Sequence, residues 1–291
     1  MRYRGCDCMT YGIPYRGSKS KIAKWVISNL PSANTFVDLF AGGCAVTHAA
    51  MLSGKYNNFI ANDLTQGPNI FMYALIGGFE NMEGGITREQ FNTIDNANIP
   101  SEEREAIKLL YSFGNNRTDY LWSKDIEEVK VPAERMLSAS SLHERRMEYK
   151  KFLRALIKYI NKYKTNNINN KFECLQGLEG LERLERLRGL KNLECLRVSN
   201  LDYREVKIPE NAVVYADPPY RNTRCTGYRD FSPQEFDEWL STVSFPVYVS
   251  ERICPKDCVE ISRKERMCSM AAKCNTPTIE KLFIQKRFVK G

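Results

Sequence analysis

Short apolar runs separated by polar turns mark the two ends of the chain, and each run is typical of a buried β-strand. The runs contain β-branched and aromatic residues over about five positions and are bounded by polar residues, glycine or proline. They are Thr35 to Phe40, Phe59 to Asp63, Leu196 to Asn200, Ala212 to Ala216, Phe245 to Val249 and Ile279 to Phe288. Basic residues alternate with apolar ones in the tail from Lys281 to Lys290, which predicts an outer strand.

Helical periodicity appears between these runs. Ile22 to Leu30 is an amphipathic segment that Pro31 ends, and the serines before it predict a hydroxyl cap at its first turn. Such an N-terminus, with Lys19 beside it, favours an anion, although an ordinary capped surface helix fits the pattern equally well. Ser232-Pro233-Gln234-Glu235 is a capping box that predicts another helix start.

The middle of the chain, from about Gly77 to Asn170, is polar and mostly helical in its pattern. Leu142 to Lys164 predicts a helix with an apolar face and eight basic residues against two acids on the other. An irregular stretch from Tyr111 to Trp122 mixes aromatic rings, amides and an arginine. Such features suit phosphate and base contacts, while a solvated helix face and a packed loop are the alternatives.

A leucine tract follows. Leucines stand at every third position from Leu175 to Leu196, and a period of three drifts around an α-helix. We therefore assign the tract no chemistry and treat residues 171–194 as a connector.

Charge and composition narrow the class of protein. The 291 residues are 43% hydrophobic and 27% charged, and the net charge of +8 suits a polyanionic partner. No apolar run is long enough for a membrane span, and the first residues do not resemble a signal peptide, so we expect a cytoplasmic protein. The ten cysteines lack the paired spacing of a zinc site, so we expect reduced thiols and no metal.

The most specific chemistry stands directly after the strand Ala212 to Ala216. Asp217 is followed by two prolines and Tyr220. Prolines donate no backbone hydrogen bond and fix φ, so strand pairing stops there. The result is a stiff corner with one carboxylate and one aromatic ring, at the sheet edge where α/β proteins bind ligands.

A second group of residues predicts a nucleotide cofactor. The strand ending at Phe40 runs into Ala41-Gly42-Gly43-Cys44 and then a helix, which is the first half of a Rossmann-like unit. Asp63 ends the next strand about twenty residues later, a spacing that suits the ribose hydroxyls of an adenosine cofactor. The alternative role of Asp63 is to cap the next helix.

Asp217-Pro218-Pro219-Tyr220 resembles the catalytic motif of amino-group DNA methyltransferases, and the order of motifs resembles the Dam-like adenine-N6 enzymes. In that family the Asp side chain and the Pro218 carbonyl accept hydrogen bonds from the target amine, and Tyr220 stacks on the base. The resemblance implies S-adenosylmethionine as methyl donor. The residues it implies for the cofactor are Tyr15, Lys19, Asp38, Phe40, Gly42, Asp63, Asp202 and Asp217. Ser18 and Cys44 stand where the family usually has glycine.

The resemblance implies an α/β fold, a Rossmann-like mixed sheet flanked by helices, with an inserted, mainly helical target-recognition domain. Residues 1–76 and 195–291 would form the catalytic domain and 77–170 the insertion. We expect site-specific methylation of a flipped-out adenine in double-stranded DNA, by a monomer in a bacterium or a phage-infected host. The expected DNA contacts are Asn116, Arg117, Tyr120, Lys150, Lys151 and Arg154.

Three alternatives stay open at this point. They are an N4-cytosine methyltransferase, an RNA amino-group methyltransferase and an inactive DNA-binding relative. Methylation at carbon 5 of cytosine is disfavoured, because it needs a thiolate that usually follows a proline, and no proline here precedes a cysteine.

Overall fold

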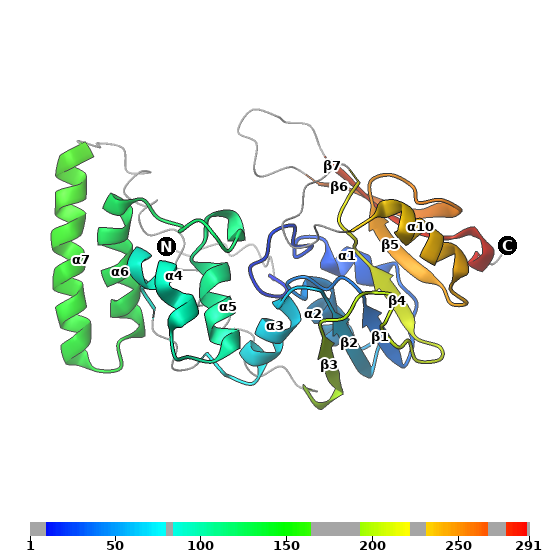
Figure 1. The fold of residues 1–291 in the computed structure, drawn as a ribbon, viewed down its shortest axis with the longest axis horizontal. Coiled ribbons are helices and arrows are strands. Elements are labelled where there is room, and N and C mark those ends of the chain that lie inside the picture. The colour runs from blue at the N-terminus through cyan, green and yellow to red at the C-terminus, as the bar shows by residue number, and fades with distance from the viewer. Residues whose placement is uncertain (1–9, 80–83, 164–192, 222–230, 267–277, 290–291) are drawn as a thin grey trace, which may run out of the picture. The chain divides into compact units, whose positions relative to one another are not determined.

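The computed structural model describes residues 10–79, 84–163, 193–221, 231–266 and 278–289. The chain forms two compact units (Figure 1). The first comprises Met1–Ile13, Ser18–Asn69 and Lys191–Gly291, and the second comprises Pro14–Gly17 and Ile70–Leu190. Each is described by itself.

The first unit is built on a seven-stranded sheet in the order β3-β2-β1-β4-β5-β7-β6 (Figure 1). The first five strands of that order are parallel, while β7 is antiparallel to both of its neighbours. The strands are β1 (Thr35–Asp38), β2 (Asn58–Asn62), β3 (Leu196–Ser199), β4 (Val213–Ala216), β5 (Val247–Glu251), β6 (Cys258–Arg266) and β7 (Thr278–Gln285). This mixed sheet, flanked by helices, confirms the predicted α/β class.

The two faces of the sheet bury different side chains, because successive residues of a strand point to opposite faces. Val37, Val214 and Val249 form one core with Phe236 and Leu240 of α10 (Pro233–Thr242). The other face carries Asp38 and, opposite it in the register, Tyr215. The hydroxyl of Thr47, in α2 (Ala45–Leu52), binds Asp38, so α2 covers this second face.

Two capped helix starts were predicted, and both helices are present, but only one of the two hydroxyl caps is confirmed. The Ser232 hydroxyl accepts a hydrogen bond from the Glu235 amide at 3.2 Å, with Pro233 in the first turn of α10. The hydroxyl cap of the first helix was wrong. Its helix, α1 (Ala23–Ser28), begins after Ile22, which makes no side-chain cap, and the Ser20 hydroxyl instead accepts from the Tyr11 amide.

The place of the C-terminal strand was also predicted wrongly. β7 lies between β5 and β6 rather than at an edge, and Leu282 and Phe283 are fully buried. The Arg287 guanidinium, which follows the strand, donates to the carbonyls of Leu240 and Ser241 at the end of α10. The outer strand is β6, whose polar sequence shows no strand pattern.

The second unit is helical in its described part. It holds most of α3 (Gly67–Leu75), then α4 (Arg88–Thr93), α5 (Ser101–Leu110), α6 (Lys124–Ser138) and α7 (Leu142–Tyr163). Val129 and Ala133 of α6 pack against Phe152 of α7. The leucine tract lies outside the described residues except for its last members, where the short helix η3 (Leu193–Cys195) leads into β3.

Candidate active site

The corner after β4 holds a carboxylate inside the protein. β4 is buried along its whole length, and Asp217 follows it on the face that also carries Tyr215 and Asp38. Lys19 Nζ lies 2.8 Å from Asp217 Oδ1, and the two side chains are 7% and 16% exposed. The structure thus brings together two predicted site residues that are far apart in the sequence.

Burial dominates the ionisation of this carboxylate. The pKa of Asp217 is raised to about 6, because the effect of burial, to which the nearby Glu280 and Glu251 add, outweighs the opposite effect of Lys19. Near neutral pH Asp217 is therefore mostly ionised and acts as a hydrogen-bond acceptor.

Tyr220 is held at both ends of its side chain. Two prolines stiffen the backbone before it, and its hydroxyl donates to Glu280 Oε2 at 2.6 Å. Lys19 Nζ lies 4.4 Å from the ring centroid and the Arg252 guanidinium 5.3 Å, both within cation–π range. Burial raises the pKa of Tyr220, so the phenol stays protonated.

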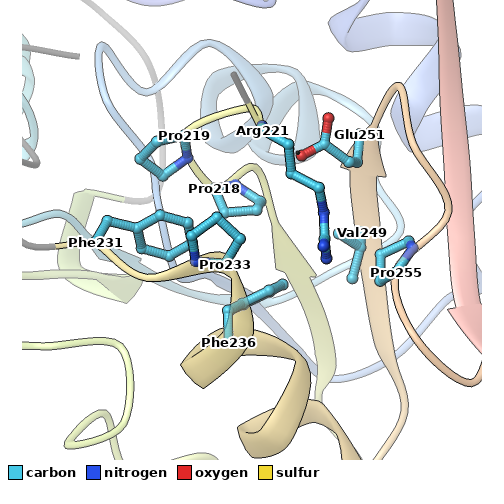
Figure 2. A pocket seen from close by; sticks show the side chains of 9 residues that line it. All are labelled: Pro218, Pro219, Arg221, Phe231, Pro233, Phe236, Val249, Glu251 and Pro255. Carbon is cyan, nitrogen blue, oxygen red and sulfur yellow. Dashed lines mark hydrogen bonds between the residues drawn. The ribbon is translucent and has the colours of Figure 1, made fainter. Parts of the chain in front are cut away.

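Arg221, the residue after Tyr220, is hydrogen-bonded to β5 and makes an ion pair with α10. The Arg221 amide donates to Glu251 Oε2 at 3.3 Å, and its guanidinium binds Asp237 at 2.6 Å. A shallow hollow lies beside Arg221. Figure 2 shows the Arg221 side chain running between Pro218 and Val249 within it.

The glycine turn is present, with Cys44 in a conformation that favours glycine. Gly42 and Cys44 have φ of +50° and +57°, and Cys44 begins α2 with its side chain fully buried. Burial raises the pKa of its thiol, which keeps the thiol protonated. A fully buried, protonated thiol suits packing better than nucleophilic attack.

Asp63 holds the turn from within. Its Oδ2 accepts from the Gly42 amide at 2.7 Å, and its Oδ1 accepts from the Thr65 amide and hydroxyl. The residue is fully buried. In this structure the carboxylate positions the backbone of the turn, and its contact with a ribose stays a prediction.

Asp38 is the buried carboxylate with capacity left for a ligand. Its Oδ2 accepts from the Thr47 hydroxyl at 2.8 Å, whereas Oδ1 has no hydrogen-bond partner among the described residues. Burial raises the pKa of Asp38 to about 8, although the Thr47 hydrogen bond lowers it. A buried oxygen without a donor suits a cationic group of a ligand, such as an ammonium.

The segment before Lys19 packs directly on the glycine turn. The Ile13 amide donates to the Gly43 carbonyl at 2.9 Å, and the Gly12 amide donates to Nδ1 of His48 at 2.9 Å. Burial lowers the pKa of His48 to about 4, so the imidazole is neutral and Nδ1 is its acceptor. These contacts connect the N-terminal segment to the predicted cofactor site.

Phe40 and Asp202 contact neighbouring parts of the same unit. Phe40 is buried in an aromatic cluster, 5.2 Å from the Tyr203 ring and 5.8 Å from Phe236. Asp202 is half-buried and makes an ion pair with Arg204, whose hydrogen bonds lower the pKa of Asp202. Tyr15 belongs to the second unit and is half-buried there.

The residues predicted to contact bases have internal roles. Tyr120 is buried and its hydroxyl donates to the Ile86 carbonyl at 2.7 Å. Asn116 Oδ1 accepts from two amides of its own turn, and Arg117 binds Glu105 at 3.4 Å. Phe113, in the same hairpin, is 69% exposed.

The basic side chains of α7 fall into two groups. Lys158 and Lys162 make ion pairs with Glu128 and Asp125 of α6, each at 2.7 Å. Lys151 pairs with Glu148 in its own helix. Within the described part of the chain, the other group makes no ion pair and recurs every four residues along one exposed face: Arg146, Lys150 and Arg154.

Sequence reasoning missed two carboxylates beside the catalytic motif, one bonded to Tyr220 and one to the Arg221 amide. Glu280 and Glu251 are each 3% exposed and come from β7 and β5. The sequence contains only a weak signal for the role of Glu280. Glu280 is buried between the more exposed Ile279 and Lys281, which places an acid on an inward position of a strand.

Metal ligands, membrane-spanning helices and cysteines were also subjects of the predictions. In the ranges that the structure describes, no three His, Cys, Asp or Glu side chains are grouped as metal ligands. The same ranges contain no helix with the length and apolar character needed to cross a membrane. Cys44, Cys195, Cys254 and Cys258 are free thiols. The other six, Cys6, Cys8, Cys174, Cys225, Cys268 and Cys274, lie outside the described residues.

The geometry can be compared with known families. The curated proteins contain no match to the chain. The model of the D12 class N6 adenine-specific DNA methyltransferases matches residues 15–257, which include Lys19, the glycine turn and Asp217 to Tyr220. Enzymes of this family transfer a methyl group from S-adenosylmethionine to N6 of adenine in DNA. The chain therefore belongs to the D12 class N6 adenine-specific DNA methyltransferase family and is an adenine-specific DNA methyltransferase.

Proposed function

We propose that Asp217, Pro218 and Tyr220 carry the methylation of an adenine flipped out of double-stranded DNA. The observation that supports this most is the buried Asp217 carboxylate on the stiff corner after β4, in the unit that also holds the Tyr220 ring. An exocyclic amine is a poor nucleophile, because its lone pair is delocalised into the ring. Acceptors at Asp217 and at the Pro218 carbonyl draw on its two N–H bonds and localise the lone pair on nitrogen.

Flipping exposes the base for this chemistry, and stacking on Tyr220 replaces part of the stacking that the base loses in the duplex. By analogy with single-strand binding, that stacking contributes about 1–3 kcal/mol. For the base to reach Asp217, the Lys19 ammonium has to leave its present place, because it occupies the acceptor and covers the ring.

S-adenosylmethionine supplies an electrophilic methyl group on a sulfonium. We propose that Asp38 binds the ammonium of its methionine part through Oδ1, the oxygen without a partner. Gly42, Phe40 and Asp202 line the cofactor site, and Asp63 supports it by holding the Gly42 amide. Lys19 and Tyr15 remain candidates for its carboxylate. The chemistry proposed for these residues needs no metal.

The inserted residues 77–170 are proposed as the target-recognition domain of a monomeric enzyme. The exposed row Arg146, Lys150 and Arg154 suits phosphates, which position a protein on DNA without reading sequence. In the hairpin, Phe113 is the large apolar side chain left open to a base. Lys151, Asn116 and Arg117 act indirectly in this proposal, by ordering the helix surface and the hairpin.

Methyl transfer from tritiated S-adenosylmethionine tests the proposal. Wild-type protein should label unmethylated duplex DNA, with N6-methyladenine as the product of hydrolysis. Asp217→Ala should lose at least about 10²-fold in rate, since one preorganised electrostatic contact is usually worth that much. Label on N4-methylcytosine, on RNA alone or on nothing would favour one of the three alternatives.

A further inference from the structure

Glu280 is a buried acid that touches the aromatic ring of the catalytic motif from another strand. Its Oε2 accepts the Tyr220 hydroxyl at 2.6 Å, and the residue is 3% exposed. It lies on β7, beyond residue 257, where the family match ends. We infer that Glu280 is a positioning residue that fixes the Tyr220 ring for stacking on the target base, an inference that rests on the proposed role of Tyr220.

Glu280 is held in place because its strand, β7, lies inside the sheet. β7 is hydrogen-bonded to β5 on one side and to β6 on the other, and Leu282, two residues after Glu280, is fully buried. A carboxylate on such a strand has a fixed backbone position. It therefore defines one place for the hydroxyl of Tyr220.

The hydrogen bond to Glu280 restrains the Tyr220 side chain at its hydroxyl, the atom farthest from the backbone. A tyrosine ring swings about χ1, and its hydroxyl travels farthest in that motion. The two prolines restrain the backbone end, so a bond at the hydroxyl restrains the other. Stacking on a base requires one ring orientation, and small errors of position at a reacting centre cost large factors in rate.

Tyr215 provides a matched control in the same sheet. Its hydroxyl bonds to the Ser250 hydroxyl at 2.8 Å and is fully buried, but it lies inside the core and outside the proposed catalytic group. Tyr220→Phe and Tyr215→Phe remove the same oxygen from two buried tyrosines. If Glu280 served only to satisfy a buried hydroxyl, the two changes would affect turnover alike.

The experiment compares kcat and the KM for S-adenosylmethionine in Tyr220→Phe, Glu280→Leu, their double variant, Glu280→Gln and Tyr215→Phe. We expect Tyr220→Phe and Glu280→Leu each to lower kcat about tenfold or more, with the cofactor KM unchanged. The double variant should be no slower than the slower single one, because both remove one interaction. Glu280→Gln keeps an acceptor oxygen and should recover most of kcat, and Tyr215→Phe should match wild type.

Base stacking is followed separately with duplex DNA that carries 2-aminopurine at the target position. Its fluorescence should differ from wild type in Tyr220→Phe and Glu280→Leu, but not in Tyr215→Phe. Wild-type turnover in Tyr220→Phe, or multiplying losses in the double variant, overturns the inference. If Glu280→Leu fails to fold, equal kcat in Tyr220→Phe and Tyr215→Phe overturns it alone. If the wild-type protein methylates DNA, the proposed function holds whatever the variants show. If the wild-type protein does not methylate DNA, the proposed function itself is wrong.

Discussion

The ammonium of Lys19 lies 2.8 Å from Oδ1 of Asp217, so the segment before the first helix reaches the carboxylate of the catalytic motif directly. The resemblance implied a contact between Lys19 and the cofactor. In the structure its charge instead stabilises the ionised form of Asp217 against the cost of burial. The same ammonium lies over the ring of Tyr220.

The fall of kcat/KM at low pH, the acid limb of the pH profile, should depend on the ion pair between Lys19 and Asp217. Asp217 has to be ionised to accept hydrogen bonds from the amine, and its pKa is about 6, so kcat/KM should fall below that pH. Lys19 lowers this pKa, so Lys19→Met should move the limb to higher pH. Lys24→Met, on the exposed side of α1, is the control and should leave the limb in place. An unmoved limb in Lys19→Met would mean that another group controls it.

Asp38→Asn should have opposite effects on stability and on cofactor binding. The pKa of Asp38 is raised from 3.8 to about 8, so the folded state holds the proton more tightly than the unfolded state does. Its stabilising contribution is complete below pH 4 and is lost as the pH rises to 8. The melting temperature of Asp38→Asn relative to wild type should therefore rise with pH over that interval. Affinity for S-adenosylmethionine should fall about tenfold or more, since Asn cannot ionise beside the bound ammonium as Asp38 can. A pH-independent difference in melting temperature would contradict the burial of this charge.

Gly12→Ala should detach the N-terminal segment from the glycine turn. Gly12 has φ of +67°, and an added Cβ would lie 2.2 Å from the Gly43 carbonyl oxygen, a backbone atom. Gly17 has φ of +79° with no atom within 4 Å of its Cβ position, so Gly17→Ala carries the conformational cost alone, about 1–2 kcal/mol. Urea unfolding should show a larger loss for Gly12→Ala, and calorimetry a weaker cofactor affinity. Equal effects of the two substitutions would argue against this docking.

The exposed row on α7 should contribute to DNA affinity without selecting a sequence. Replacing Arg146, Lys150 and Arg154 with Ala should weaken binding to all duplexes alike. Each lost phosphate contact should reduce the slope of log affinity against log salt by about 0.9. The control is Lys158→Ala with Lys162→Ala, because those ammonium groups already pair with α6. A slope that stays at the wild-type value in the triple variant would make the row a solvated helix face.

Hydrophobic pattern alone located β1, β2 and β4, because these strands are buried along most of their length and are short and apolar. It did not locate β6, where Val259 and Ile261 are partly exposed on an outer strand and basic residues fill much of the rest. The order of strands in the sheet is likewise absent from the pattern. β7 was predicted at an edge because basic residues alternate with apolar ones in its C-terminal part, and nothing in that pattern shows that β6 lies outside it.

The candidate site was predictable where its residues stand together in the sequence, as Asp217 to Tyr220 do. Contacts across long separations were not. Glu280 follows Tyr220 by 60 positions and meets it only because β7 lies next to β5. The roles of charged residues also depended on neighbours. The sequence suggested that Lys158 contacts phosphate, whereas in the structure Lys158 makes an ion pair with Glu128 of α6.

The antiparallel insertion of β7 next to β5 sets an order on biosynthesis. A nascent chain that has emerged up to residue 257 contains every residue of the family match, including the whole catalytic motif. Its β5 strand nevertheless has an unpaired edge, because the strand that pairs with it, β7, lies beyond residue 257. Such an edge is a template for pairing with other chains. Pairing of β7 with β5 therefore both covers this edge against aggregation and brings Glu280 to the Tyr220 ring, so a chain that stopped at residue 257 would lack both.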